Sequence, residues 1–276
     1  MKRRLRLAGG AAAGADEFIL GRNAVLEVLR AGRRRVSRVH VAEGARPTEV
    51  LAEILRLARA HEIPVVTGPS HEWELTGEKS HGVAAETSAY SYVALEDILH
   101  EAAGRRQPPL VLVLDELQDP QNVGTLLRTA EATGVHGVVL PYRRAAVITP
   151  AVVRASSGAS EHLLVAAENL AQAIDRLQQE RLLVVGLDAG DGPRPLEAID
   201  LAGPLALVVG SEGGGMRRLV RERCDVLAGL PVGGRIGSLN AAVAGSIALY
   251  LAWSRRRMAG DEGLSAAARI DAPPES

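Results

Sequence analysis

The sequence contains few aromatic residues, a single cysteine and no long apolar run, and each shortage excludes a class of protein. Aromatic residues make up 3% of the 276 residues, within a hydrophobic share of 47%, so the core must be mainly aliphatic. Cys224 has no partner for an internal disulfide, which fits a reducing compartment. No apolar stretch reaches the roughly 18 residues of a membrane span, and the basic start resembles no signal peptide. The sequence therefore predicts a cytoplasmic protein without a membrane segment.

Metal ligands and a uniform basic charge are also lacking. The seven histidines are scattered without the paired spacing of a zinc site, so no bound metal is expected. The net charge of -1 argues against a uniformly basic nucleic-acid binder. Residues 1–40 nevertheless hold ten Lys or Arg against three acidic residues. This basic region is either a solvated tail or a contribution to nucleic-acid binding through arginine, whose planar fork suits phosphate.

The pattern of apolar residues predicts two α/β domains. Residues 1–16 are expected to form a disordered basic tail. Residues 17–92 form a first compact unit, with helices expected over 23–30 and 47–61 and strands over 38–42, 63–66 and 82–85. Residues 93–108, with a helix over 95–103 and a Pro-containing end, are expected to be a linker.

The second domain is expected over residues 109–258, followed by a loose C-terminal tail over 259–276. Aliphatic strands are predicted over 110–114, 137–140, 163–166, 182–185 and 205–209, with a weaker one over 226–230. Helices fall between them, the clearest over 169–180, and an Ala-rich closing helix is expected from Leu239 to about Arg257. Aliphatic strands that alternate with helices are typical of a parallel sheet covered on both faces.

Three short polar segments follow the ends of apolar runs in this second domain. The first is Asp119-Pro120-Gln121-Asn122-Val123-Gly124, with Arg128 just beyond. Asn122 and Arg128 are six residues apart and point about 120° away from each other on an ideal helix. Both reach one cleft only if Asn122 precedes the helix proper. The alternative is structural, with Asp119 as a helix N-cap and Arg128 as a surface cation.

The second segment, Gly210-Ser211-Glu212-Gly213-Gly214-Gly215-Met216, follows a strand. A phosphate-binding P-loop would require a Gly-Lys-Ser/Thr ending, and a dinucleotide fingerprint would require G-x-G-x-x-G, so the segment fits neither. Either it is a structural turn, or its bare backbone holds a ligand with Glu212 beside it. In the third segment, Ser238-Leu239-Asn240, Ser238 or Asn240 could cap the closing helix, and capping alone would explain either residue.

Taken in order, the three segments resemble the motifs of the SpoU (TrmH) family of RNA ribose 2′-O-methyltransferases, in the SPOUT superfamily. Leu114 to Arg128 is similar to the first motif, Val208 to Asp225 to the second and Leu230 to Ala244 to the third. The N-terminal unit also resembles the small L30e-like domain that binds substrate in the branch containing the bacterial 23S rRNA guanosine 2′-O-methyltransferase. The chain departs from many relatives at Ala241-Ala242, where they carry Val-Ser, and at Ser80-His81-Gly82, where they carry His-Gln-Gly.

The resemblance implies a fold and a chemistry that spacing alone does not give. The expected fold is a trefoil-knotted parallel-sheet methyltransferase domain preceded by the small α/β domain. The expected reaction is S-adenosylmethionine-dependent methylation of a ribose 2′-hydroxyl in RNA, most simply of a guanosine in 23S rRNA. The alternatives are methylation of a different rRNA or tRNA nucleotide and a non-catalytic RNA-binding relative. The expected partners are RNA and a second copy of the chain. Gly210, Leu230 and Leu239 match the cofactor-binding positions. The catalytic positions are matched by Asn122, Arg128, Glu212, Ser238 and Asn240.

The role of the arginine needs care, because a guanidinium is not normally deprotonated in proteins and makes a poor general base. We therefore assign Arg128 to an RNA phosphate and to the developing alkoxide. Asn122, Ser238 and Asn240 would orient the nucleotide and shape the cofactor loop. Glu212 would either orient Arg128 or accept the proton.

Overall fold

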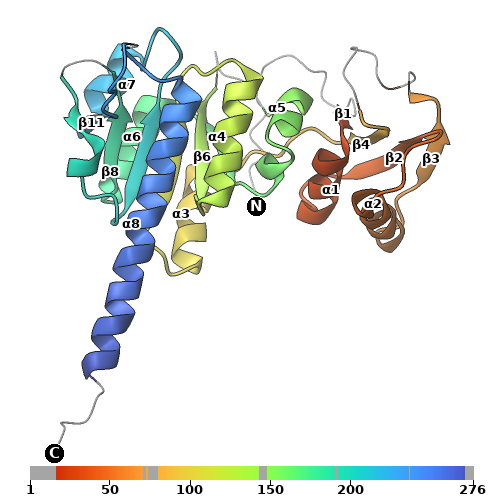
Figure 1. The fold of residues 1–276 in the computed structure, drawn as a ribbon, viewed down its shortest axis with the longest axis horizontal. Coiled ribbons are helices and arrows are strands. Elements are labelled where there is room, and N and C mark those ends of the chain that lie inside the picture. The colour runs from red at the N-terminus through yellow and green to blue at the C-terminus, as the bar shows by residue number, and fades with distance from the viewer. Residues whose placement is uncertain are drawn as a thin grey trace, which may run out of the picture.

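The computed structural model describes residues 17–70, 73, 80–142, 148–189, 192–235 and 237–270, the last eleven by their backbone alone. They form two α/β units that lie next to each other (Figure 1). The tail predicted over residues 1–16 lies outside the described residues. Within them, no helix combines the length and apolar character that crossing a membrane requires.

The N-terminal unit is a four-stranded mixed sheet with two helices. Its strand order is β1-β4-β2-β3, in which β4 runs antiparallel to β1 and β2, and β3 runs parallel to β2. The elements are β1 (Glu17–Leu20), α1 (Arg22–Ala31), β2 (Val36–Ala42), α2 (Glu49–Ala60), β3 (Val65–Gly68) and β4 (Val83–Thr87). Helix α1 ends at Gly32 in a left-handed conformation, and the Thr48 hydroxyl caps α2 by accepting from the Leu51 N–H. The predicted helices and strands are confirmed, and β1 is an addition to them.

The C-terminal unit is a seven-stranded sheet in which every strand pair is parallel, as the sequence predicts. The strand order is β7-β6-β5-β10-β8-β11-β9. The strands are β5 (Leu110–Leu114), β6 (Gly137–Pro141), β7 (Val165–Glu168), β8 (Leu183–Leu187), β9 (Arg194–Pro195), β10 (Leu205–Val209) and β11 (Val226–Gly229). The helices are α3 (Leu95–Gly104), α4 (Pro120–Ala132), α5 (Pro150–Ala155), α6 (Leu170–Gln179), α7 (Arg218–Arg223) and α8 (Ala241–Ile270), with short 3₁₀ turns at Ala159–Glu161 and Leu196–Ala198.

Two apolar layers cover the two faces of this sheet. Alternate residues of β5 point to opposite faces, so that Val111 and Val113 pack in one layer and Leu110 and Leu112 in the other. The first layer includes buried residues of α3, α6 and α7, and the second includes buried residues of α4 and α8. Helix α3 lies in the segment predicted as a linker, but its Leu95 and Ile98 are fully buried in the first layer. It therefore serves as part of the core of the C-terminal unit.

Strand β11 lies between two strands that precede it in the chain. It pairs with β8 on one side and β9 on the other. A Cβ built on Gly229 would lie 3.4 Å from the Asp188 carbonyl oxygen and 3.4 Å from Pro193 Cβ, which flank the connection between those two strands. In a threaded chain, a later segment such as β11 passes between the two ends of an earlier connection, such as the one that joins β8 to β9. The trefoil knot itself remains a prediction.

Helix α8 is longer than the sequence analysis predicted and extends away from the body (Figure 1). It continues to Ile270, where a loose tail was expected, because the Ala-rich residues beyond Gly260 favour a helix. The triplet Arg255-Arg256-Arg257 is therefore inside the helix and does not mark its C-terminus. Arg256 instead donates to backbone carbonyls of Leu201, Gly203, Pro108 and Pro109.

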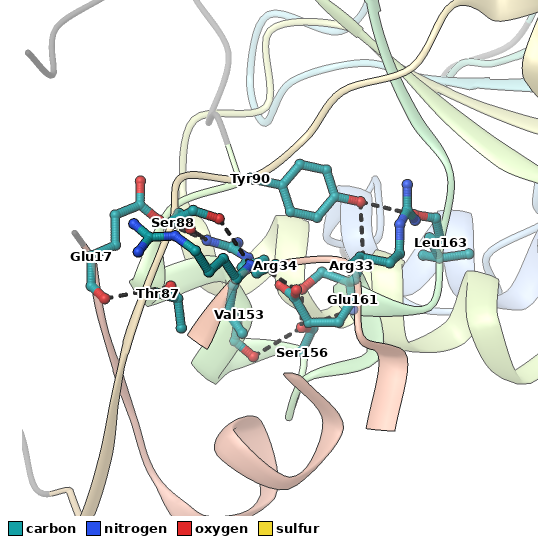
Figure 2. A network of polar contacts seen from close by, with 12 residues as sticks. Glu17, Arg33, Arg34, Thr87, Ser88, Tyr90, Val153, Ser156, Glu161 and Leu163 are labelled. Atoms are coloured by element: carbon teal, nitrogen blue, oxygen red, sulfur yellow. Dashed lines mark hydrogen bonds and ion pairs between the residues drawn. The ribbon is translucent and has the colours of Figure 1, made fainter. Parts of the chain in front are cut away.

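The two units are joined by a buried polar network (Figure 2). Arg34 Nε donates to Glu161 Oε2 over 2.9 Å, and neither side chain is exposed to solvent. The Tyr90 hydroxyl donates to the carbonyls of Ser160 at 3.1 Å and Leu163 at 2.8 Å. Burial raises the pKa of Glu161, an effect that neighbouring Arg34 opposes. Since removing either partner would leave a buried charge uncompensated, the network holds the two units in one orientation.

Candidate functional site

The first two polar segments leave the sheet at the same edge. Strands β5 and β10 are parallel neighbours, with Leu114 opposite Val209 at their carboxyl ends. The Asp115 N–H donates to the Val209 carbonyl over 2.8 Å, so the chains diverge only beyond this point. Open parallel sheets generally bind ligands outside the carboxyl ends of their strands.

One side chain from each polar segment meets at this edge in a hydrogen-bonded cluster. Asn122 Nδ2 donates to Glu212 Oε1 over 2.8 Å, and Asn240 Nδ2 donates to Asn122 Oδ1 over 3.2 Å. The Asn240 amide also donates to Glu212 Oε1. We call these three residues the Asn–Glu–Asn cluster. Along the chain, Glu212 and Asn240 follow Asn122 by 90 and 118 residues. Asn122 is half-buried, and Glu212 and Asn240 are exposed.

Helix capping positions both asparagines. The Asp119 carboxylate accepts from the N–H groups of Gln121 at 3.2 Å and Asn122 at 3.3 Å, and Pro120 occupies the first turn of α4. Asn240 Oδ1 accepts from the N–H groups of Ala242 at 2.9 Å and Val243 at 3.1 Å at the start of α8. The structural alternatives are therefore correct for Asp119 and Asn240. Asn240 uses its oxygen for the helix and its amide hydrogens for the cluster.

Close backbone packing shapes the glycine-rich loop around Glu212. Ser211 and Gly215 exchange two backbone hydrogen bonds, of 2.9 and 3.0 Å. A Cβ on Gly210 would lie 2.3 Å from the carbonyl carbon of Gly215, a distance that real Cβ atoms do not adopt. Only glycine therefore fits at position 210, and the turn holds Glu212 out toward the asparagines.

Two residues that the sequence analysis missed secure the far side of this loop. Asp115 is fully buried and accepts from both the backbone N–H and the Nε of Arg217, each over 2.7 Å. A carboxylate directly after the aliphatic strand β5 is the sequence signal that could have found it. Its partner is 102 residues away, which no local pattern indicates.

Arg128 lies apart from the Asn–Glu–Asn cluster. Asn122 is inside the first turn of α4, so the geometric condition for a shared cleft is not met. The Arg128 guanidinium donates to the Ser157 hydroxyl over 3.3 Å. Among the described residues, no hydrogen bond or ion pair joins Arg128 to Glu212, so the hypothesis that Glu212 orients Arg128 finds no support within one chain.

The remaining predicted residues lie on the loop between β11 and α8 and at its ends. Leu230 is half-buried against the core, whereas Ser238 and Leu239 are exposed. A Cβ built on Gly233, Gly234 or Gly237 would meet nothing within 4 Å, so this loop stands clear of the protein body. Its backbone groups and the Leu239 side chain are thus accessible to a ligand at the edge where Gly210 lies. The part of the chain that the structure describes has no group of three or more His, Cys, Asp or Glu side chains suited to a metal.

Comparison with protein families gives two matches that together follow the two units. Residues 109–250 match the SpoU rRNA Methylase family. Residues 18–93 match the substrate-binding family of RNA 2′-O ribose methyltransferases.

Curated relatives align over most of their own length. The chain is 38% identical over 248 residues to YacO of Bacillus subtilis, named as a TrmH family tRNA/rRNA methyltransferase, and covers 98% of it with 89% of its own length. It is 41% identical over 246 residues to an uncharacterized tRNA/rRNA methyltransferase of Mycolicibacterium vanbaalenii, covering 88% of this chain and 78% of that protein.

Solved structures share the fold at lower identity. The SpoU methyltransferase AviRb of Streptomyces viridochromogenes, in complex with AdoMet, has a TM-score of 0.72 at 23% identity, over 88% of this chain and 91% of that one. An AdoMet-bound rRNA methyltransferase of Sinorhizobium meliloti has a TM-score of 0.69 at 23% identity, over 86% and 87% of the two chains.

Proposed function

The chain belongs to the SpoU rRNA methylase family, and from this premise we propose that it methylates a guanosine ribose of 23S rRNA with S-adenosylmethionine. The observation that carries the proposal is the Asn–Glu–Asn cluster. Capping and loop packing account for where its residues lie, but not for three exposed or half-buried polar side chains bonded to one another at a ligand-binding edge.

The residues at the edge fit the proposed cofactor. Gly210, Leu230 and Leu239 offer backbone groups and apolar surface around the accessible loop, which suits an adenine ring and an amino-acid tail. S-adenosylmethionine, when bound, supplies an activated methyl group on a good leaving group. The protein's own task is then largely to position the ribose hydroxyl. We assign that orienting role to Asn122, Asn240 and Ser238, with Glu212 as the carboxylate available to accept the hydroxyl proton.

Arg128 would serve the RNA and not the cofactor. Its guanidinium remains protonated, so it can bind a phosphate of the RNA beside the target nucleotide. Its position away from the cluster agrees with a separate contact to the nucleotide.

Methyl transfer tests the proposal directly. The full chain, methyl-tritiated S-adenosylmethionine and RNA from a strain that lacks this gene should yield 2′-O-methylguanosine in 23S rRNA. Arg128→Ala should lower the transfer rate by about 10²–10³-fold and leave cofactor affinity unchanged, because its charge acts on the RNA. Arg105→Ala, at an exposed arginine that pairs with Glu101, is the matched control and should transfer normally. Label found in tRNA or at another rRNA nucleotide would show that the target is not a guanosine of 23S rRNA. Near-normal transfer by Arg128→Ala would show that Arg128 is not needed for the reaction.

The remaining predicted partner is a second copy of the chain. Leu239, Val243, Ile247 and Tyr250 are each at least 39% exposed and repeat at helical spacing, so they form one apolar face on and before α8. We assign this face to a homodimer. Ile247→Asp should convert a dimer to a monomer in sedimentation analysis, whereas Leu219→Asp, at a more exposed apolar site on α7, should not. A monomeric wild-type chain would refute this assignment.

A further inference from the structure

A cationic cleft lies where the N-terminal unit meets the methyltransferase unit. It has a volume of about 500 Å³ and is open to solvent. Arg22, Arg46 and His81 line it from the first unit, and Arg154 and Ser157 from the second. No Asp or Glu is among the described residues that line it. Arg22 and Arg46 place two cationic groups on a lining whose described residues include no carboxylate, and such a lining favours an anionic ligand.

Arg22 is fixed in place within this cleft. Its Nε donates to the His81 carbonyl and its Nη1 to the Thr48 hydroxyl, each over 2.9 Å. Neither partner carries a negative charge, so these contacts orient the guanidinium without neutralising it. A cation held in one orientation loses less entropy when it binds an anion.

The cleft is one hydrogen bond away from Arg128. Ser157, which lines the cavity, accepts from Arg128 Nη1 over 3.3 Å. Ser157 also has a φ of 55° after the end of α5, in a left-handed region where glycine is favoured and other residues are strained. A serine in this conformation lowers the stability of the fold. Its hydroxyl makes the hydrogen bond that connects the cleft to Arg128.

The two walls of the cleft cannot easily move apart. The Arg34–Glu161 pair and Tyr90 hold the units together (Figure 2). A Cβ on Gly158, next to Ser157, would lie 2.5 Å from Glu27 Cβ, so α1 is in direct contact with this turn. The distance between the arginines of the two units is thereby set by the fold.

We propose that this cleft binds the RNA sugar-phosphate backbone beside the methylated nucleotide, so that both units hold the strand while Arg128 contacts the target. This inference rests on the proposed function, because it takes RNA as the substrate. Arg22, Arg46 and Arg154 are the phosphate ligands, and Ser157 is the positioning residue between them and Arg128. The cleft thus sets which stretch of RNA reaches the Asn–Glu–Asn cluster.

Arg46 provides the test because it is exposed at the rim of the cleft. With RNA from the gene-deletion strain as the probe, Arg46→Gln should raise the KM for RNA about tenfold, and Arg46→Gln combined with Arg154→Gln should raise it further. Each lost phosphate contact should lower the slope of log affinity against log salt by about 0.7–0.9. Arg59→Gln removes the same charge from an exposed position of the first unit outside the cleft and should change neither quantity. Unchanged KM and slope in the double variant would overturn the proposal.

Ser157→Gly separates the positioning role from a structural one. Glycine relieves the left-handed strain, so the variant should be at least as stable as the wild type in urea. Methyl transfer should nevertheless fall several-fold in kcat, with cofactor affinity unchanged; a fully active variant would remove Ser157 from the proposal. If the wild type transfers no methyl group, the proposed function fails. The salt slopes of direct RNA binding still decide whether the cleft is a phosphate site.

Discussion

The carboxyl ends and the amino ends of the strands in the seven-stranded sheet, which we call its carboxyl edge and its amino edge, use polar residues in opposite ways. At the carboxyl edge, Asn122, Glu212 and Asn240 bond to one another through their side chains. At the amino edge, polar side chains bond mainly to the backbone. The buried His136 accepts from the Leu110 N–H at 3.0 Å through Nδ1, and Arg256 donates to carbonyls of residues just before β5 and β10.

The polar groups of the amino edge serve stability, whereas the carboxyl edge is where we propose that the chemistry takes place. Burial lowers the pKa of His136, which favours its neutral form, and burial lowers the pKa of Arg256 to about 10, which still leaves it charged at neutral pH. Both side chains bond to backbone groups at the starts of β5 and β10. The carboxyl edge leaves amide and carboxylate groups accessible, and these can exchange their partners for a ligand. Variants at the two edges should therefore affect different measurements.

The largest expected effect is on cofactor binding, at Gly210. Gly210→Ala places a methyl group 2.3 Å from Gly215 and 2.4 Å from the Met216 nitrogen, so the loop must move. Overpacking of this kind costs about 1–3 kcal/mol, and affinity for S-adenosylmethionine should fall about 10–100-fold by calorimetry.

Gly203→Ala is the matched control at the amino edge. An added Cβ there meets nothing within 4 Å, and the backbone needs no positive φ. The variant should bind cofactor as the wild type does. Equal affinity in both variants would mean that the loop at Gly210 does not hold the cofactor.

The next effect is on stability, at Arg256. Arg256→Ala leaves carbonyls of the amino edge without their charged donor, and the free energy of unfolding should fall by about 2–3 kcal/mol in urea. Arg255→Ala, at the exposed neighbouring position, should change it by less than about 0.5 kcal/mol. Cofactor affinity should be the same in both. A loss of affinity in Arg256→Ala alone would show that the two edges are coupled.

The sequence predicts some elements of this fold and misses others. The aliphatic strands and the long amphipathic helices were found to within a few residues, because their periodicity is local. Strand β9, two residues long, and helices α5 and α7, six residues each, are too short to produce a period. The sequence predicts too short a helix α8, because the arginine triplet at 255–257 is typical of a helix C-terminus.

The sequence motifs predicted the residues of the candidate site, but not the ion pairs that hold the surrounding structure in place. The motifs supplied Asn122, Glu212 and Asn240, which the structure brings together. Asp115 with Arg217 and Arg34 with Glu161 join residues 102 and 127 positions apart, and such pairs leave no trace in a local pattern. The separation of Arg128 from the cluster follows from helix geometry, once the structure places Asn122 inside α4.

The smallest effect on stability, and the finest distinction, concerns Asn240, because it serves both structure and site. Asn240→Ala removes the N-cap of α8 and the amide bonded to Glu212, so it should lose about 1 kcal/mol of stability and most methyl transfer. Asn240→Ser keeps an oxygen for the cap but lacks the amide donors. It should retain wild-type stability in urea and still fail to transfer methyl groups. If Asn240→Ser is fully active, Asn240 is only a helix cap, and the carboxyl edge would then resemble the amino edge in using its polar residues for stability.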